Sequence, residues 1–228
     1  MAKIAGIGER ALVEAIGVFF LTFIGAGSVI AAQFAGLGGS GILVIALANG
    51  LALALAVSFA MNISGGHINP AVTIAAVVNK SMRIADAAVY ILAQLIGALV
   101  AGFLLVSIYP AVSGIAVNYG TPMLGESVSV VQGILFEAVM TFILVFTIMG
   151  TVVDRRAPKI AGFGVGLAVV IDVLAGGPFT GAAMNPARWF GPAIASGFLA
   201  NWYVYIIGPL AGAIVAGLLY KYIIFKQR

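Results

Sequence analysis

The 228-residue sequence predicts an all-α membrane protein in which six transmembrane helices surround two re-entrant half-helices, arranged as an inverted repeat. Three observations support this fold class. Only 8% of the residues are charged, whereas a soluble domain carries about 25%, so a soluble fold of this size could not cover its own surface. The apolar residues form several stretches of roughly 20, the length that crosses a ~30 Å hydrocarbon core. Finally, the chain repeats itself internally.

Six apolar stretches are long enough to span a bilayer. They cover residues 11–33, 41–61, 85–109, 127–150, 160–177 and 203–224. Two further apolar segments, 69–79 and 185–195, are too short to cross, and each begins with Asn-Pro-Ala. The first stretch has full transmembrane length, so the charges before it indicate an anchor rather than a cleaved signal.

The Lys and Arg residues predict the orientation. With six spans, ten of the eleven cations fall on one side of the bilayer. They are Lys3, Arg10, Lys80, Arg83, Arg155, Arg156, Lys159, Lys221, Lys226 and Arg228. The positive-inside rule puts this side, with both termini, in the cytoplasm, and the expected location is the cell membrane. Arg188, in the second short segment, is the exception and needs its own explanation.

The internal repeat divides the single domain, 1–228, into halves of about 1–118 and 119–228. Gly50-Leu51-Ala52 returns as Gly166-Leu167-Ala168, and Asn69-Pro70-Ala71 returns as Asn185-Pro186-Ala187, both 116 residues later. Each half has three spans, an odd number, so the halves lie in opposite orientations. Such an inverted repeat places the functional site near the midplane, where the halves meet.

The Asn-Pro pairs predict the starts of two short helices. Asparagine is a preferred N-cap, and proline suits the first helical position, where its missing N–H has no intrahelical partner. A single copy could simply cap an ordinary helix, but two copies at the repeat offset favour re-entrant segments. Because the halves are inverted, the two N-termini meet. Each brings a partial positive charge of about half a unit, which repels cations, while the Asn69 and Asn185 amides can donate to water.

The residues before each Asn-Pro pair predict an extended chain whose carbonyls face a pore. Irregular backbone at membrane depth is tolerated where it lines a wet cavity or is buried in protein. The predicted pore-lining carbonyls belong to Gly65, Gly66, His67, Ile68, Gly181, Ala182, Ala183 and Met184.

The segments Ser-Gly-Gly-His-Ile-Asn-Pro-Ala-Val-Thr (64–73) and Thr-Gly-Ala-Ala-Met-Asn-Pro-Ala-Arg-Trp-Phe-Gly-Pro (180–192) resemble the two signature loops of the aquaporin (major intrinsic protein) family. The resemblance covers the whole chain. It implies an aquaporin-like fold with one pore per subunit and four subunits together. It also implies a passive channel for water, with other small neutral solutes as additional cargo, that excludes ions and protons. The implied partners are these solutes and the lipid bilayer, with no cofactor, metal or nucleic acid.

By the same resemblance, Arg188 is the filter arginine, and the other filter positions fall on Asn49, Val173 and Ala182. A salt bridge at the pore rim is the alternative for Arg188. Strict water channels usually have Phe, His and often Cys at the other three positions. The residues present here imply a wider filter, closer to vacuolar-type and archaeal members. A glycerol, urea or ammonia facilitator of the same family is therefore the alternative function.

Four further polar residues need an interpretation. Glu14 and Glu137 are intramembrane carboxylates, which by default suggest a proton relay; the resemblance favours acceptors that support the re-entrant loops. His67 could be a pH gate, although a static loop-packing role is favoured. Asp172 has no counterpart in the first half. It could tune the outer vestibule or pair with Arg188, and a solvated or subunit-interface position is favoured.

Other classes fit less well. An ion-coupled transporter also uses inverted repeats, but it would need ion-coordinating groups at the midplane, and the acids here are few and symmetric. An enzyme is not expected, because the chain has no Cys, one His and no nucleophile–base arrangement or metal-ligand cluster.

Overall fold

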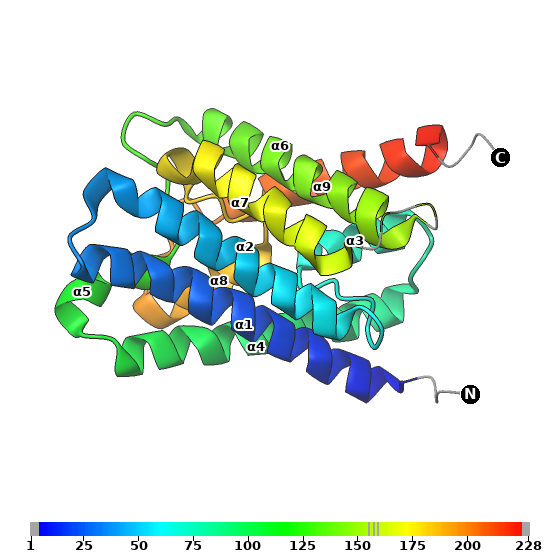
Figure 1. Ribbon diagram of the computed structural model, residues 1–228, viewed down its shortest axis with the longest axis horizontal. Coiled ribbons are helices and arrows are strands. Elements are labelled where there is room, and N and C mark those ends of the chain that lie inside the picture. The colour runs from blue at the N-terminus through cyan, green and yellow to red at the C-terminus, as the bar shows by residue number, and fades with distance from the viewer. Residues whose placement is uncertain (1–4, 155, 157, 159, 225–228) are drawn as a thin grey trace.

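The computed structural model describes residues 5–154, 156, 158 and 160–224, and these residues form helices and connections without strands (Figure 1). Six helices are long and apolar enough to cross a membrane, so the predicted fold class is confirmed. They are α1 (Ile7–Phe34), α2 (Gly41–Ala60), α4 (Ile84–Ile108), α6 (Val130–Ile148), α7 (Ala161–Thr180) and α9 (Val204–Leu219).

The two predicted half-helices are present and are too short to cross. The helix α3 (Pro70–Val78) has 9 residues and α8 (Pro186–Ser196) has 11. At 1.5 Å per residue they extend only about 14 and 17 Å. The Asn69 side chain caps α3 by accepting from the Ala71 N–H (2.8 Å), and the Asn185 side chain caps α8 by accepting from the Ala187 N–H (3.0 Å).

The two halves pack their helices in the same way. The helix α1 packs on α4, α6 packs on α9, and α2 meets α7 at the junction between the halves. Close approach depends on glycine in both. A Cβ on Gly97 of α4 would lie 2.1 Å from the Ala15 carbonyl oxygen, and a Cβ on Gly212 of α9 would lie 2.0 Å from the Ala138 carbonyl oxygen. Small residues let membrane helices pack this tightly.

The connections contain short helices that the pattern did not predict. These are η1 (Gly38–Ser40), α5 (Ala111–Ala116) and η2 (Asn118–Gly120); in addition, α6 and α9 continue as the π-helical turns η3 (Met149–Val153) and η4 (Tyr220–Ile224). The helix α7 runs three residues past its predicted end at 177. It stops at Gly181, whose φ of +78° is the left-handed conformation that ends many helices.

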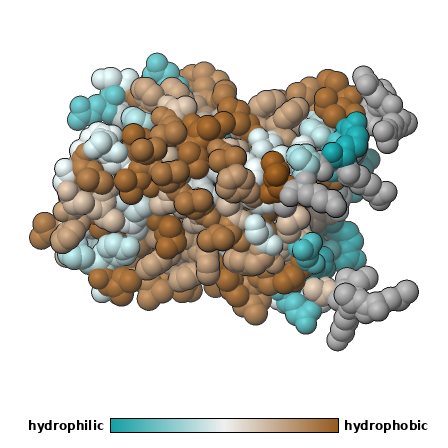
Figure 2. Space-filling view, viewed as in Figure 1, coloured by the Kyte–Doolittle hydropathy of each residue, from teal (hydrophilic) through white to brown (hydrophobic). Residues whose placement is uncertain are grey.

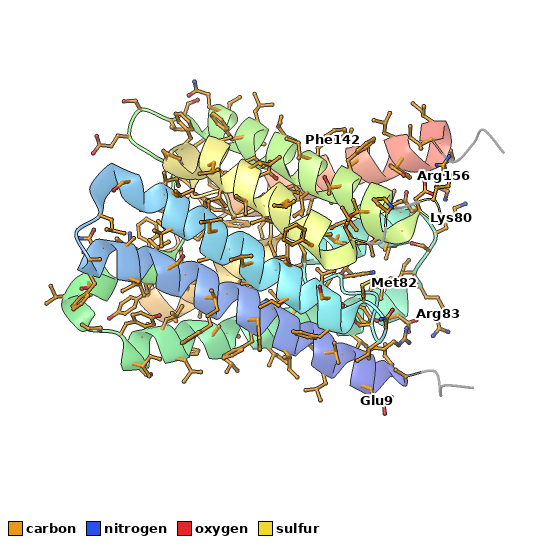
Figure 3. All side chains as sticks on the ribbon, in the orientation of Figure 1. Glu9, Lys80, Met82, Arg83, Phe142 and Arg156 are labelled. Carbon is orange, nitrogen blue, oxygen red and sulfur yellow. The ribbon has the colours of Figure 1, made fainter. Side chains whose placement is uncertain are left out.

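The surface matches a membrane protein. Apolar side chains cover the middle of the molecule, and polar ones gather at its ends (Figure 2). Glu9, Lys80, Arg83 and Arg156 lie at one end, where α1 begins and α9 finishes (Figure 3). We call this the inner end and the opposite one the outer end. Of the predicted inner cations, Lys3, Arg155, Lys159, Lys226 and Arg228 lie outside the described residues.

Candidate functional site

The N-termini of the two half-helices touch in the centre of the molecule. Asn69 Nδ2 donates to the carbonyl oxygen of Met184 at 2.8 Å, and Asn185 Nδ2 donates to the carbonyl oxygen of Ile68 at 2.8 Å. Each asparagine therefore binds the residue that precedes the other one. All four are buried, so reciprocal hydrogen bonds join the two halves at their midpoint.

Both loops before the half-helices have the same unusual backbone. Left-handed φ angles between 45° and 93° occur at three positions in each loop. These residues are Gly65, Gly66 and Ile68 in the first loop and Gly181, Ala182 and Met184 in the second. A non-glycine residue in this region costs about 1–3 kcal/mol and clusters at functional sites. The strain at Ile68 and Met184 turns their carbonyls toward the opposite asparagine.

Glu14 holds the first loop in this shape. It is fully buried and accepts hydrogen bonds from the Ser64 hydroxyl (2.6 Å) and the His67 backbone N–H (2.9 Å). It also accepts from the Ile68 backbone N–H and from Gln94 Nε2 (2.8 Å). These contacts are those expected of a carboxylate that supports the first loop.

Glu137 holds the second loop through the equivalent donors. It is also fully buried and accepts from the Thr180 hydroxyl (2.7 Å) and from the backbone N–H groups of Ala183 (2.9 Å) and Met184 (2.7 Å). Unsatisfied polar groups are costly in a bilayer. These bonds explain why a buried glutamate occupies the equivalent position in each half.

His67 packs inside the first loop. Its Nδ1 lies 3.1 Å from the Thr73 hydroxyl, and its ring meets the Tyr90 ring edge-on at 5.4 Å between centroids. These contacts are those of a loop-packing residue. His67 nevertheless lines both the central and the inner cavity.

Three adjoining cavities run through the molecule. A central cavity of about 20 Å³, about the room that one water needs, is lined by residues of both halves. An inner cavity of about 620 Å³ shares His67, Val72 and Ile148 with it, and an outer cavity of about 400 Å³ shares Arg188. Two wide mouths therefore meet a passage that admits molecules one at a time.

The predicted filter residues lie where the central and outer cavities join. Asn49, Ala182 and Arg188 line the central cavity, whereas Val173 lines the outer one. Arg188 Nη1 donates to the Gly120 carbonyl oxygen at 3.1 Å. Asn49 Nδ2 donates to the carbonyl oxygens of Ile45 (2.8 Å) and Gly25 (3.5 Å). All four filter residues are buried.

Asp172 is not where it was expected. It is 2% exposed, and no described residue donates to its Oδ2, so the favoured solvated or subunit-interface position is wrong. The spacing gives the reason, because Asp172 shares one face of α7 with the buried Val165 and Val169. It forms no ion pair with Arg188, and neither does any other described acid. The rim salt bridge considered for Arg188 is therefore absent from the described residues.

Sequence reasoning missed several polar supports of the loops. The Tyr90 hydroxyl donates to the Ser64 carbonyl oxygen (2.8 Å), and the Tyr205 hydroxyl donates to the Thr180 carbonyl oxygen (3.0 Å). The two tyrosines are 115 residues apart, close to the repeat offset. That correspondence could have identified them. Gln94, which bridges Glu14 and Thr73, has no such signal.

Comparisons with known proteins agree with this geometry. The family model described as "Major intrinsic protein" matches residues 3–220. Aquaporin TIP4-4 of Zea mays is 43% identical over 233 residues, covering 99% of this chain and 90% of the relative. Aquaporin TIP2-1 of Arabidopsis thaliana is 39% identical, covering 92% and 84%. Among solved structures, the aquaglyceroporin from Plasmodium falciparum superposes with a TM-score of 0.86 at 25% identity, covering 96% of this chain and 97% of the other.

Six membrane-spanning helices, two half-helices and a narrow central passage define a channel of the aquaporin type. The chain belongs to the major intrinsic protein family. This is a family of transport channels and not of enzymes, and the chain is an integral membrane protein.

Proposed function

We propose that this protein is a passive channel for water that also passes small neutral solutes and excludes ions and protons. One observation carries the proposal: a cavity with room for about one water lies where two half-helix N-termini meet and adjoins a larger cavity at each end. The aquaporin names of the relatives agree with it.

Exclusion of cations follows from the charges around the passage. Both half-helices point their N-termini at the centre, each with a partial positive charge of about half a unit. Arg188 adds a full charge at the outer side of the central cavity. A cation entering the cavity loses its hydration shell and meets these positive charges, whereas a neutral molecule avoids both costs.

Water passes because the central wall offers a few well-placed hydrogen bonds. Each amide nitrogen carries two hydrogens, and Asn69 and Asn185 each use one to bind the opposite loop. The second can reach a water oxygen in the cavity. A water that accepts from both asparagines points its hydrogens away from the centre and cannot accept a proton from its neighbour. Much of the remaining wall is apolar, with Leu21 and Leu144 facing the cavity, and binds water weakly enough to release it.

The same proposal includes the architecture expected from the sequence. The chain forms one domain of two inverted repeats, about 1–118 and 119–228, and assembles as a homotetramer in the cell membrane with both termini cytoplasmic. The matching loops of the two halves support the inverted repeat. Lys80, Arg83 and Arg156 at one end support the orientation. The homotetramer and the cell membrane are carried over from the sequence analysis.

A glycerol, urea or ammonia facilitator is the second candidate. The absence of an aromatic residue at the Asn49 position favours it, because a bulky ring there would narrow the filter. The likeness to an aquaglyceroporin structure is compatible with it.

Stopped-flow light scattering on proteoliposomes tests the proposal. Vesicles with the purified protein should respond to an osmotic step much faster than protein-free vesicles of the same lipid, with no ion gradient present. Parallel measurements with glycerol and urea gradients rank the solutes, and a trapped pH dye measures proton flux. Water permeability equal to that of the lipid alone, or a requirement for an ion gradient, would refute the channel.

A further inference from the structure

The inner cavity carries an unbalanced positive charge. Arg10 and Lys221 line it, and no Asp or Glu is among its described lining residues. The outer cavity is balanced by comparison, because Glu126 and Arg188 both line it. A neutral solute needs no charge at either mouth, so the proposed channel function does not explain the two inner cations.

Other cations at the inner end are either neutralised or fully solvated. Lys80 is exposed, and two arginines are paired with neighbouring acids. These ion pairs are Arg83 with Asp86 and Arg156 with Asp154. Arg10 and Lys221 are instead part-buried and form no ion pair with any described acid. Cations that only mark the inner side of a membrane protein have no need to line its cavity.

Arg10 has a donor that no described residue uses. Its Nε is buried and has no hydrogen-bond partner. The guanidinium lies 5.9 Å from the centre of the Tyr90 ring, which lines the same cavity. Glu14, one turn further along α1, accepts hydrogen bonds from the first loop and from Gln94 instead. Because buried donors are rarely left unpaired, this one indicates an acceptor from outside the chain.

Lys221 also has free donors. Its ammonium group carries three hydrogens, and among the described residues it donates to one acceptor, the carbonyl oxygen of Asn79 at the end of α3. This bond offsets part of the negative charge at the C-terminus of α3. Lys221 lies in η4 and Arg10 lies near the start of α1, so the two cations reach one cavity from opposite ends of the chain.

The two side chains suit a phosphate group. A guanidinium matches two phosphate oxygens at once, and an ammonium binds them as a point charge. Much of the cavity wall is apolar, as at Met61, Val72 and Val145, and a cleft of one charge sign with such walls concentrates the opposite ion. The inner cavity, at about 620 Å³, has room for a phosphate, whereas the central one, at about 20 Å³, does not. An anion can therefore enter from the inner end and go no further.

We propose that the inner cavity is a binding site for a phosphate group, held by Arg10 and Lys221. His67, Val72 and Ile148 line both this cavity and the central one, so a bound anion lies at the entrance of the passage and obstructs water. Met82, which also lines the cavity, lies at the inner end with Lys80 (Figure 3). Free phosphate and the phosphate of an anionic lipid headgroup share this chemistry. The binding is independent of the proposed channel function, whereas the obstruction rests on it.

Isothermal titration calorimetry of the detergent-solubilised protein with inorganic phosphate tests the site. Arg10→Gln and Lys221→Gln should each raise the dissociation constant about tenfold, the worth of one hydrogen bond between charged groups. Arg10→Lys keeps the charge and should bind more tightly than Arg10→Gln. Lys80→Gln is the matched control, because it removes an exposed cation at the same end. Binding that is equal in wild type and in both Gln variants, or that Lys80→Gln weakens as much, would overturn the site.

Stopped-flow scattering on proteoliposomes distinguishes the two sources of phosphate. For a free-phosphate site in phosphatidylcholine vesicles, phosphate on both faces should lower the water permeability, with a midpoint near the calorimetric dissociation constant. Chloride at the same ionic strength should not. For a lipid site, phosphatidylglycerol should lower the permeability without free phosphate, and Arg10→Gln should restore it.

The outcomes separate this inference from the proposed function. If the wild-type protein neither binds phosphate nor responds to phosphatidylglycerol, the site is refuted. Binding with unchanged water permeability would overturn the obstruction. A protein that binds phosphate but conducts no water would refute the proposed channel and leave the phosphate site standing.

Discussion

Removing the acceptor that holds the second loop should destabilise the protein in proportion to the donors left without a partner. Glu137 Oε1 accepts from the Thr180 hydroxyl and the Ala183 N–H, and Oε2 accepts from the Met184 N–H. In Glu137→Gln the amide oxygen can replace Oε1, but the NH2 group then faces the Met184 N–H. In Glu137→Ala both backbone N–H groups lose their acceptor, while the hydroxyl can rotate to another one.

The expected magnitudes follow from that count. A buried donor without a partner costs about 1–3 kcal/mol. Glu137→Gln should therefore cost about 1–3 kcal/mol and Glu137→Ala about 2–6 kcal/mol, a large fraction of the 5–15 kcal/mol by which native proteins are typically stable. Loosening Met184 also weakens the hydrogen bond from Asn69 to its carbonyl. Water permeability should thus fall together with stability.

Thermal unfolding of the detergent-solubilised protein, followed by tryptophan fluorescence, measures the first effect, and stopped-flow scattering measures the second. The midpoint temperatures should decrease from wild type to Glu137→Gln to Glu137→Ala. Glu126→Gln, the same chemical change in an exposed loop, should leave the midpoint unchanged. If Glu137→Gln unfolded like wild type but abolished transport, the loop-support role would be refuted in favour of a proton relay.

Three shorter predictions concern the pore and the inner loop. Arg188→Val should raise permeability to glycerol and to ions, measured by scattering and by conductance, and unchanged selectivity would remove Arg188 from the filter. Asn185→Asp introduces an acceptor at the constriction and should admit cations; normal conductance and normal water flux would contradict its electrostatic role. Arg156 donates three hydrogen bonds to Asp154 from its side chain and one from its backbone and so lowers the pKa of this carboxyl. The stabilisation that the ionised Asp154 gains from Arg156 is therefore present at neutral pH and is lost only when the pH falls through that lowered pKa. Asp154→Asn should remove it at neutral pH, and faster tryptic cleavage of the connection between α6 and α7 would report the loss.

The internal repeat made most of the central site predictable. Asn69 and Asn185, each opening a segment too short to span, indicated that two N-termini meet, and the repeat offset paired the residues around them. Hydropathy alone was sufficient for the six spans, because a bilayer leaves few alternatives to helices of about 20 residues. The burial of Asp172 could also have been predicted, because its spacing from Val165 and Val169 places all three on one helix face. Its charge had instead favoured a solvated or subunit-interface position.

The amino-acid sequence by itself determined the class of protein, the number of spans, the repeat and the two short helices, since these depend on local hydrophobicity and on capping chemistry. Only the tertiary structure decided which atoms face each other. The reciprocal bonds between the asparagines and the opposite loops and the bonds that Glu14 and Glu137 accept from those loops join residues that are far apart in the chain. No local pattern in the sequence predicts such contacts, because they depend on which distant residues the fold brings together.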